Sequence, residues 1–334
     1  MQHGLRLLNI KLCDIPKQVH HLSKRLIFNK TSRNTTFRTM EQQQQGRTTL
    51  EGLAASYEQN GYAVLNDFLD ADEVQMIRNE TTRLIREESR SHANKLQVFG
   101  NEFNMKSRYF LDSSDKICYF FEKSAVNLET LELQMPEEQS LAKIAHALHS
   151  LNPIFKKVTT SDKIKQVFKA IDFTEPTVVQ SMVIFKNPNV GGAYTPHQDA
   201  SFIYAEPLHV AGIWLALDDA TIENGCLEFI PGSHKWPLAR RFVRTDNTKD
   251  GDDLLEWTAP VANYDESKFV KVPIKRGGLV LIHGLVVHRS AENRSDKSRW
   301  AYTFHAYDKA KSRYSDKNWL QINVNDTFMP VYAN

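Results

Sequence analysis

The chain has 334 residues, of which 41% are hydrophobic and 10% aromatic, so it can bury one large hydrophobic core. The formal net charge is only +2, yet residues 1–40 hold eight Lys or Arg against the single acid Asp14, which gives +7 there and −5 elsewhere. A mildly acidic body gives no reason to expect a nucleic-acid partner, and no apolar run approaches the ~20 residues that span a bilayer. The three cysteines form no zinc spacing and no disulfide framework, which favours a reducing compartment.

Residues 1–47 are basic and irregular, and we expect them to form a disordered extension ahead of the domain. Basic segments poor in acids are also typical of cleaved organelle signals. Residues 11–19 resemble an N-terminal peroxisomal signal, and Met40 offers an alternative start. We expect a cytoplasmic protein. Because the composition of residues 1–40 cannot bury much of a core, we expect this segment to be dispensable for activity. Mitochondrial or peroxisomal targeting through this segment is the alternative.

The globular domain is expected over residues 48–330, and it opens with helices. A short helix over residues 50–59 ends at an Asn-Gly pair, a plausible left-handed stop, and a strand follows over residues 62–65. Asp70 then caps a helix with a glutamate three residues later. A further helical stretch is expected over about residues 136–150.

The segment 89–123 is long, and its first part is polar and irregular. Long loops of this kind are often functional or mobile. The segment also contains a cluster of Tyr and Phe residues, which predicts that it covers the mouth of an active site. A core strand over residues 117–121 with a loose connection is an equally good interpretation.

From residue 177 the hydrophobic period becomes that of strands. Four such runs cover residues 178–185, 210–217, 279–282 and 300–304. Gly and Pro turns separate them. Helices first and many short strands afterwards predict an α+β, mainly β fold: a double-stranded β-helix (jelly roll) with packed helices.

Three residues in the C-terminal half predict a metal site. His197 and Asp199 are alternate residues, and alternate side chains of a strand share one face. His288 can supply a third ligand from a distant strand. Two imidazoles and one carboxylate leave half of an octahedron open, which favours a non-haem Fe(II) that activates O2. A lone His is usually structural and this chain has twelve, so the prediction depends on the whole pattern.

The choice of third ligand is between His283 and His288, each with an arginine eleven residues later. Arg294 lies in a polar turn, whereas Arg299 opens a strand-like run. Because a cosubstrate anchor should sit on a rigid element, we pair His288 with Arg299 and expect His283 to be structural.

The guanidinium of Arg299 can bind a dicarboxylate through a bidentate contact. The sequence therefore predicts an Fe(II)- and 2-oxoglutarate-dependent dioxygenase with a small-molecule substrate. Such an enzyme uses O2, converts 2-oxoglutarate to succinate and CO2, and hydroxylates its substrate. The protein needs no catalytic acid or base beyond the metal ligands. Its role is to position the reactants and to exclude water.

These residues resemble the phytanoyl-CoA dioxygenase family over roughly residues 48–330. Besides the metal ligands, the resemblance is carried by Val179-Gln180-Ser181-Met182, Pro196-His197-Gln198-Asp199-Ala200-Ser201-Phe202, Glu223-Asn224-Gly225-Cys226-Leu227, Ile230-Pro231-Gly232-Ser233-His234 and Ile282-His283-Gly284. Residues 115–123 and the late Asn318-Trp319-Leu320 resemble one subgroup of that family in particular. The resemblance implies the jelly-roll fold and iron at His197, Asp199 and His288.

The resemblance also implies contacts to 2-oxoglutarate from Lys143, Met182, Trp214, Ser290 and Arg299. Ser290 and Arg299 would both serve the distal C5 carboxylate. Without the resemblance, Lys143 would be interpreted as a lysine on a helix surface, and Met182 and Trp214 as core residues. The substrate does not transfer, because members of the family act on unrelated compounds.

Two other functions are compatible with parts of the pattern. One is a catalytically silent, metal-binding relative that serves as a binding module. The other is a cupin-like isomerase or hydrolase that uses another divalent metal. The intact ligand set and Arg299 favour the oxygenase over the binding module. Arg299 and Ser290 favour it over the isomerase or hydrolase, because a cosubstrate anchor has no role in that mechanism.

Overall fold

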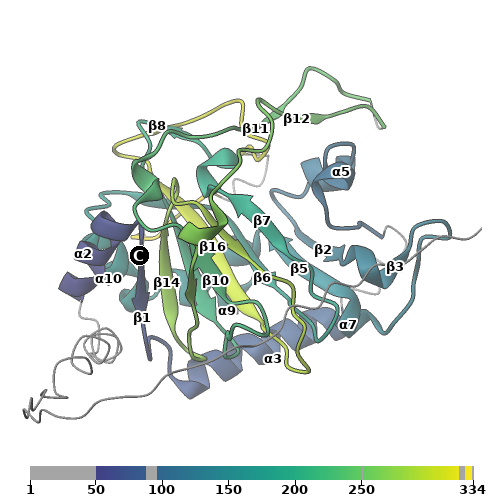
Figure 1. Ribbon diagram of the computed structural model, residues 1–334, viewed down its shortest axis with the longest axis horizontal. Helices are drawn as coiled ribbons and strands as arrows, with labels where there is room; N and C mark the ends of the chain where they lie inside the picture. The colour runs from purple at the N-terminus through teal and green to yellow at the C-terminus, as the bar shows by residue number, and fades with distance from the viewer. Residues whose placement is uncertain (1–49, 88–95, 250, 323–327, 333–334) are drawn as a thin grey trace, which may run out of the picture. The chain divides into compact units, whose positions relative to one another are not determined.

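The computed structural model describes residues 50–87, 96–249, 251–322 and 328–332 (Figure 1). The boundary predicted near residue 47 and the basic extension before it lie outside these residues. No helix in the described ranges is long and apolar enough to cross a membrane.

Two antiparallel sheets form the scaffold. The main sheet has the strand order β1-β14-β9-β16-β6-β5-β2, and β18 pairs with β6. Its strands are β1 (Tyr62–Leu65), β14 (Leu279–His283), β9 (Val210–Ala216), β16 (Ala301–Asp308), β6 (Pro176–Ile184), β5 (Leu141–His146), β2 (Ile117–Phe121) and β18 (Met329–Pro330). The four strand runs predicted from the period of two are confirmed as β6, β9, β14 and β16.

The second sheet has the order β13-β10-β15-β7. Its strands are β13 (Val270–Val272), β10 (Leu227–Phe229), β15 (His288–Ser290) and β7 (Tyr194–His197). Trp214, Val280 and Ile282 of the main sheet pack in one cluster with Leu227 and Phe229 of the second. The fold is therefore the predicted double-stranded β-helix, in which two sheets pack face to face.

Short strand pairs and turns of helix complete the connections. They are β3 (Val126–Asn127) with β4 (Glu132–Leu133), β8 (Ala205–Glu206) with β17 (Arg313–Tyr314), β11 (Phe242–Arg244) with β12 (Leu255–Trp257), and the 3-10 turns η2 (Lys123–Ala125), η3 (Asp199–Ser201), η4 (Ser233–Lys235) and η5 (Glu266–Lys268).

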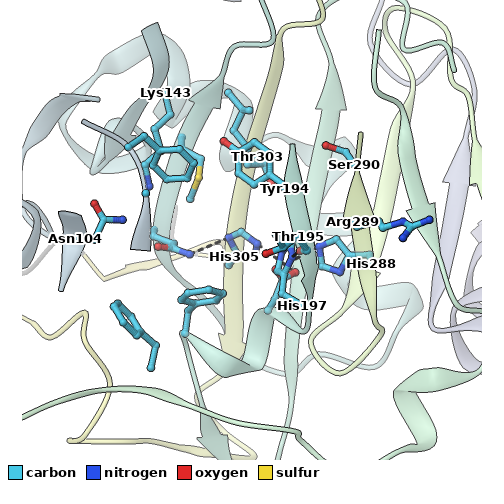
Figure 2. Close-up of a pocket in the computed structure, with 18 of the residues that line it drawn as sticks. Asn104, Lys143, Tyr194, Thr195, His197, His288, Arg289, Ser290, Thr303 and His305 are labelled. Carbon is cyan, nitrogen blue, oxygen red and sulfur yellow. Dashed lines mark hydrogen bonds and ion pairs between the residues drawn. The ribbon is translucent and has the colours of Figure 1, made fainter. Parts of the chain in front are cut away.

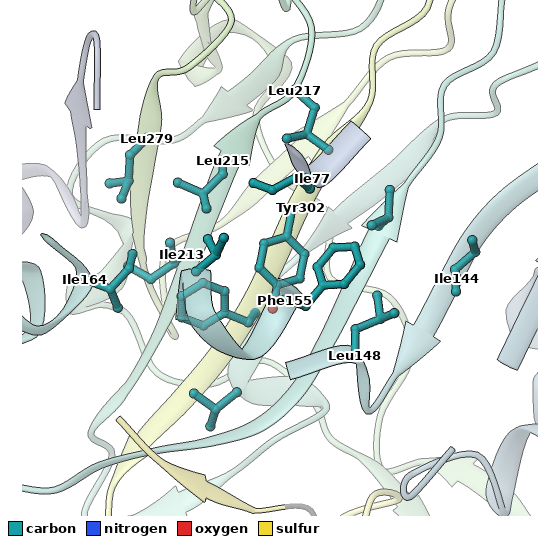
Figure 3. Packing of buried hydrophobic residues seen from close by; sticks show 14 of the residues in the cluster. Ile77, Ile144, Leu148, Phe155, Ile164, Ile213, Leu215, Leu217, Leu279 and Tyr302 are labelled. Carbon is teal, nitrogen blue, oxygen red and sulfur yellow. The ribbon is translucent and has the colours of Figure 1, made fainter. Parts of the chain in front are cut away.

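Helices pack on the face of the main sheet that points away from the second sheet (Figures 1 and 3). These helices are α2 (Leu50–Asn60), α3 (Ala71–Glu87), α8 (Leu148–Leu151), α9 (Pro153–Thr159) and α10 (Asp162–Ala170). The other short helices are α5 (Asn101–Asn104), α6 (Arg108–Leu111) and α7 (Glu137–Ser140). Ile77, Phe155 and Ile164 from helices meet Ile213, Leu215 and Tyr302 from strands in one buried cluster. Because side chains alternate along a strand, Trp214 lies on the opposite face, toward the second sheet.

The predicted N-terminal helices are confirmed, with the expected cap. The backbone N–H of Glu73 donates to Asp70 Oδ1 at 2.8 Å, and the backbone N–H of Asp70 donates to Glu73 Oε2 at 2.9 Å. This reciprocal pair satisfies two N–H groups that the first turn of α3 cannot satisfy internally.

The helix predicted over residues 136–150 is wrong. The stretch forms the short α7, then strand β5, then α8. Strand β5 lies between β2 and β6, and all six of its residues are buried. The stretch 136–150 is rich in Leu, Ala and Glu, which favour helices, and a strand buried on both faces lacks the alternation of buried and exposed positions that would mark it as a strand. Lys143 is therefore a buried strand residue and not a lysine on a helix surface.

Candidate metal centre and adjoining pocket

The three predicted metal ligands come together between the two sheets. His197 ends β7 and His288 opens β15, and the two residues are partners in the strand register. Asp199 Oδ1 lies 3.8 Å from His197 Nε2 and 3.6 Å from His288 Nε2. One ligand atom from each residue falls within 4.8 Å of the others, which is a suitable spread for a single ion.

The expectation that one strand carries both His197 and Asp199 is wrong. Strand β7 ends at His197, and Asp199 begins the 3-10 turn η3. The side chain of Gln198 is buried beneath this turn, where its amide nitrogen donates to the carbonyl of Leu285 at 2.9 Å. The turn, fixed in this way, brings the Asp199 carboxylate toward the two imidazoles.

Backbone carbonyls fix the orientation of both imidazoles. His197 Nδ1 lies 2.7 Å from the carbonyl oxygen of Thr195, and His288 Nδ1 lies 3.0 Å from that of Val286. A carbonyl only accepts, so each neutral ring donates its Nδ1 proton there. Both Nε2 lone pairs then face Asp199 Oδ1, and this is the tautomer that metal ligation requires.

The electrostatic state of these groups suits a divalent cation. Burial would raise the pKa of Asp199, but the imidazoles of His305, His288 and His197 hold that pKa well below its usual value. Burial, together with His288, lowers the pKa of His197 to about 4 although Asp199 opposes this shift. At neutral pH the carboxylate is therefore ionised and His197 is neutral.

A cavity of about 370 Å³ adjoins this cluster and is lined by both sheets (Figure 2). Met182, Thr303 and Trp214 are successive partners across β6, β16 and β9 and line it together. Ser290, which lines it from the second sheet, is the register partner of Tyr194. All five residues predicted to bind 2-oxoglutarate line this one cavity.

Arg299 is the cation that the pocket buries most completely, with 1% of its surface exposed. It lies two residues ahead of β16, and its backbone is held by two hydrogen bonds with Lys186, of 3.0 and 3.3 Å. Its guanidinium carbon lies 5.4 Å from the ring centre of Trp214. Burial lowers the pKa of Arg299 to about 10, so the guanidinium is still charged at neutral pH.

Lys143 belongs to a directed chain of hydrogen bonds at the other wall of the cavity. The Ser113 hydroxyl donates to the carbonyl of Phe110 at 2.6 Å, so its oxygen accepts from His146 Nδ1 at 2.8 Å. His146 Nε2 is then an acceptor for Lys143 Nζ, 3.1 Å away. Burial lowers the pKa of Lys143 to about 7.

His283 and Arg294 do not enter this cavity's lining. His283 Nδ1 accepts from the backbone N–H of Leu285 at 3.0 Å, and its ring packs against Tyr57 and His234. Arg294 is exposed and forms an ion pair with Glu292. The surroundings of His283 agree with the structural role expected for this residue.

Part of the segment 89–123 lies at this cavity, where Phe99, Asn104 and Phe110 are lining residues. The described part of the segment forms α5, α6 and the buried strand β2. The core strand predicted over residues 117–121 is confirmed as β2. Some residues between 99 and 110 line the pocket, and the covering of an active-site mouth by this segment stays a prediction.

The polar lining residues that were not predicted from the sequence include Gln180, Tyr194, Thr303 and His305. Gln180 lies within Val179-Gln180-Ser181-Met182, and Thr303 and His305 follow Arg299 at alternate positions of one strand face. Strand alternation from Arg299 is the signal that would have found these two. Tyr194 carries no comparable signal.

Three buried polar atoms at the cavity make no hydrogen bond of ordinary geometry within the described residues. They are Asn104 Oδ1, Arg299 Nε and the Tyr194 hydroxyl, whereas Asp199 Oδ2 faces His305 Nε2 at 3.3 Å. Buried polar groups are normally satisfied, so such a set indicates a polar ligand. The donor set of two imidazoles and one carboxylate fits Fe(II), and the buried guanidinium fits a carboxylate of 2-oxoglutarate.

Comparisons with known proteins agree with this arrangement. The family model for phytanoyl-CoA dioxygenase matches residues 57–301. The chain is 42% identical over 285 residues to the phytanoyl-CoA dioxygenase domain-containing protein 1 homolog of Caenorhabditis elegans, covering 84% of this chain and 98% of that one. It is 43% identical over 288 residues to phytanoyl-CoA dioxygenase domain-containing protein 1 of Danio rerio, covering 83% and 96%.

Among solved structures, the chain is similar to the epimerase SnoN in complex with Fe3+, alpha-ketoglutarate and nogalamycin RO. The TM-score is 0.53 at 19% identity, covering 79% of this chain and 85% of that one. At this identity the likeness supports the fold alone.

Proposed function

Because the chain belongs to the phytanoyl-CoA dioxygenase family, we propose that it is an Fe(II)- and 2-oxoglutarate-dependent dioxygenase. It would convert 2-oxoglutarate and O2 to succinate and CO2 while it hydroxylates a small-molecule substrate. The observation that carries the proposal is the convergence of His197 Nε2, His288 Nε2 and Asp199 Oδ1 in a cavity that also buries Arg299.

His197, Asp199 and His288 would hold the iron, and Fe(II) in such a site supplies O2 activation and binds the keto acid end of 2-oxoglutarate. The residues of the chain keep the His197 imidazole neutral and the Asp199 carboxylate ionised, and they direct the three ligand atoms to one point. No side chain is needed as a strong acid or base.

Arg299 and Ser290 would bind the C5 carboxylate of the cosubstrate, and the Tyr194 hydroxyl is placed to add a hydrogen bond. Arg299 is well suited because its charge is desolvated and its Nε has no protein partner within the described residues. Met182 and Trp214 would pack on either side of the cosubstrate chain. Lys143 would supply a second cation at the opposite wall.

The substrate would enter beside His197, where aromatic side chains form the cavity wall. Phe202 lies edge-on to His197 at 6.1 Å between ring centres and is 5.3 Å from Trp257, which in turn packs on Phe242. Phe99 and Phe110 line the wall on the other side. These walls favour a substrate with apolar surface near the carbon that is hydroxylated.

Succinate formation by the full-length protein tests the function, with 2-oxoglutarate as the probe and Fe(II) added or withheld. Fe(II)-dependent succinate supports the dioxygenase. Stoichiometric binding of Fe(II) and 2-oxoglutarate without succinate would instead identify the silent binding module. Metal binding without any 2-oxoglutarate binding would favour an isomerase or hydrolase.

We further propose a cytoplasmic location and a dispensable segment 1–40. None of the proposed site residues lies in that segment, and its composition cannot bury much of a core. Imaging the full chain beside a variant that begins at Met40 tests the location. Organelle import of the full chain alone would overturn it, and loss of turnover in the shorter variant would overturn dispensability.

A further inference from the structure

One row of residues crosses three neighbouring strands of the main sheet beneath the metal cluster. His305 of β16 has Gln180 of β6 as its register partner on one side and Gly212 of β9 on the other. His305 is 7% exposed and Gln180 6% exposed, so both are shielded from bulk water. Neither residue has a role in the function proposed above.

His305 faces the metal-binding carboxylate from the side opposite the other two imidazoles. Its Nε2 lies 3.3 Å from Asp199 Oδ2, whereas His197 and His288 approach Oδ1 (Figure 2). The set of ligand atoms that lie close to one another does not include His305. The geometry therefore suits an interaction with the carboxylate and not coordination of the ion.

The hydrogen-bonding chemistry of the row gives it a direction. An ionised carboxylate can only accept, so His305 Nε2 must carry the proton that faces Asp199 Oδ2. In a neutral imidazole Nδ1 is then an acceptor. The amide nitrogen of Gln180 lies 3.3 Å from that Nδ1 and can only donate, so the two contacts require the same tautomer.

The backbone is adapted to this contact at two places. The pairing of β6 with β16 shifts register between His305 and Ala306, so that Val179 is an extra residue on β6. Bulges of this kind redirect side chains beside functional sites. On the other strand, a Cβ at Gly212 would lie 3.1 Å from His305 Cδ2 and 3.2 Å from Asp199 Oδ2. Only glycine leaves ordinary contact distances for the two groups to meet there.

From this geometry we infer that Gln180 and His305 form a positioning relay for the metal-binding carboxylate. The amide of Gln180 fixes the tautomer of His305, and His305 holds Oδ2 of Asp199. Oδ1 is left as the single oxygen that faces His197 and His288, so Asp199 would offer an ion one oxygen. The inference rests on the proposed metal site and adds the residues that orient it.

Co(II) binding to the full-length protein tests the relay, because this ion reports its ligand geometry in its visible spectrum without turnover. Partners of metal ligands typically contribute 10–100-fold to metal affinity. His305→Leu should weaken Co(II) binding by roughly 10–100-fold and change the visible bands. His305→Gln should restore most of the affinity, because its amide nitrogen can donate to Oδ2. Gln180→Leu should give an intermediate loss.

His149→Leu is the matched control. His149 is also a fully buried imidazole, with Nδ1 2.8 Å from the Ser181 hydroxyl, and it lies outside the cavity lining. Its loss should lower the unfolding temperature but leave the Co(II) spectrum and the affinity of the folded fraction unchanged.

The possible outcomes separate the relay from the metal site itself. If wild-type protein binds no Co(II) or Fe(II), the proposed function fails at its first step. If wild type binds the ion and His305→Leu binds it equally well with the same spectrum, only the relay is wrong. Equal losses in His305→Leu and His305→Gln would also contradict it, because they would assign the effect to packing and not to the donated hydrogen bond.

Discussion

His197 and His288 face each other across β7 and β15, with their ring centres 4.2 Å apart. Each ring has its Nδ1 at a backbone carbonyl, so both Nε2 atoms are directed to the same side. Strand pairing therefore brings together two ligands that are far apart in the chain, and the η3 turn adds the carboxylate.

Replacement of His288 should remove the metal, whereas replacement of His283 should not. His288→Ala deletes one of three ligand atoms, so we expect loss of stoichiometric Fe(II) and no measurable turnover of 2-oxoglutarate. His283→Ala changes a ring that packs against Tyr57 and His234, so metal content should stay near wild type. Metal analysis of both purified variants decides, and the reverse pattern would show that the wrong histidine was paired with Arg299.

Arg299→Ala should raise the apparent KM for 2-oxoglutarate roughly tenfold or more, because a hydrogen bond to a charged group is typically worth about 1.5–3 kcal/mol. Arg299→Lys should recover only part of this loss, since an ammonium lacks the planar fork of a guanidinium. Initial rates over a range of 2-oxoglutarate concentrations measure both values. An Arg299→Ala enzyme with unaltered cosubstrate dependence would contradict the assignment.

Tyr194→Phe should weaken 2-oxoglutarate binding by roughly two- to tenfold, in line with a neutral hydrogen bond of about 0.5–1.5 kcal/mol. The hydroxyl is buried without a partner in the described residues, so its removal leaves no protein group unsatisfied and should not destabilise the fold. Equilibrium titration with the Fe(II)-loaded variant provides the measurement. Unchanged affinity would mean that the hydroxyl contacts something other than the cosubstrate.

The apparent KM for 2-oxoglutarate should rise with pH above about 7. Burial lowers the pKa of Lys143 in the ligand-free protein to about 7, so its ammonium form is lost as pH rises through that value. A dianion binds the ammonium form better, and binding should therefore take up a proton in this range. Lys143→Met should abolish this pH dependence, whereas a parallel KM profile in wild type and variant would exclude Lys143 from the cosubstrate site.

Much of the fold could be predicted because its main strands are short runs rich in Val, Ile, Leu and aromatic residues between Gly and Pro turns. The strands that became β6, β9, β14 and β16, and the Asp70 cap of α3, follow from local patterns. Strand β5 could not be predicted in this way. Its burial on both faces depends on β2 and β6 as neighbours, and that information is not local to residues 141–146.

The proposed metal ligands could be found from residue type and spacing, but their environment could not. The position of Tyr194 at the cavity depends on strand register, and no short motif encodes register. The turn at Asp199 has the same origin, since Gln198 is held by a carbonyl some distance along the chain, at Leu285. Lys143, Met182 and Trp214 were proposed from family resemblance alone, and the structure brings all three to the same cavity.

The most direct test of the central claim uses isotopically labelled O2 with Fe(II), 2-oxoglutarate and the full-length protein, and follows succinate by mass spectrometry. We expect Fe(II)-dependent succinate that contains one atom of the labelled O2, and we expect His288→Ala but not His283→Ala to lose this product. A wild-type protein that binds Fe(II) and 2-oxoglutarate yet leaves the cosubstrate intact would contradict the central claim.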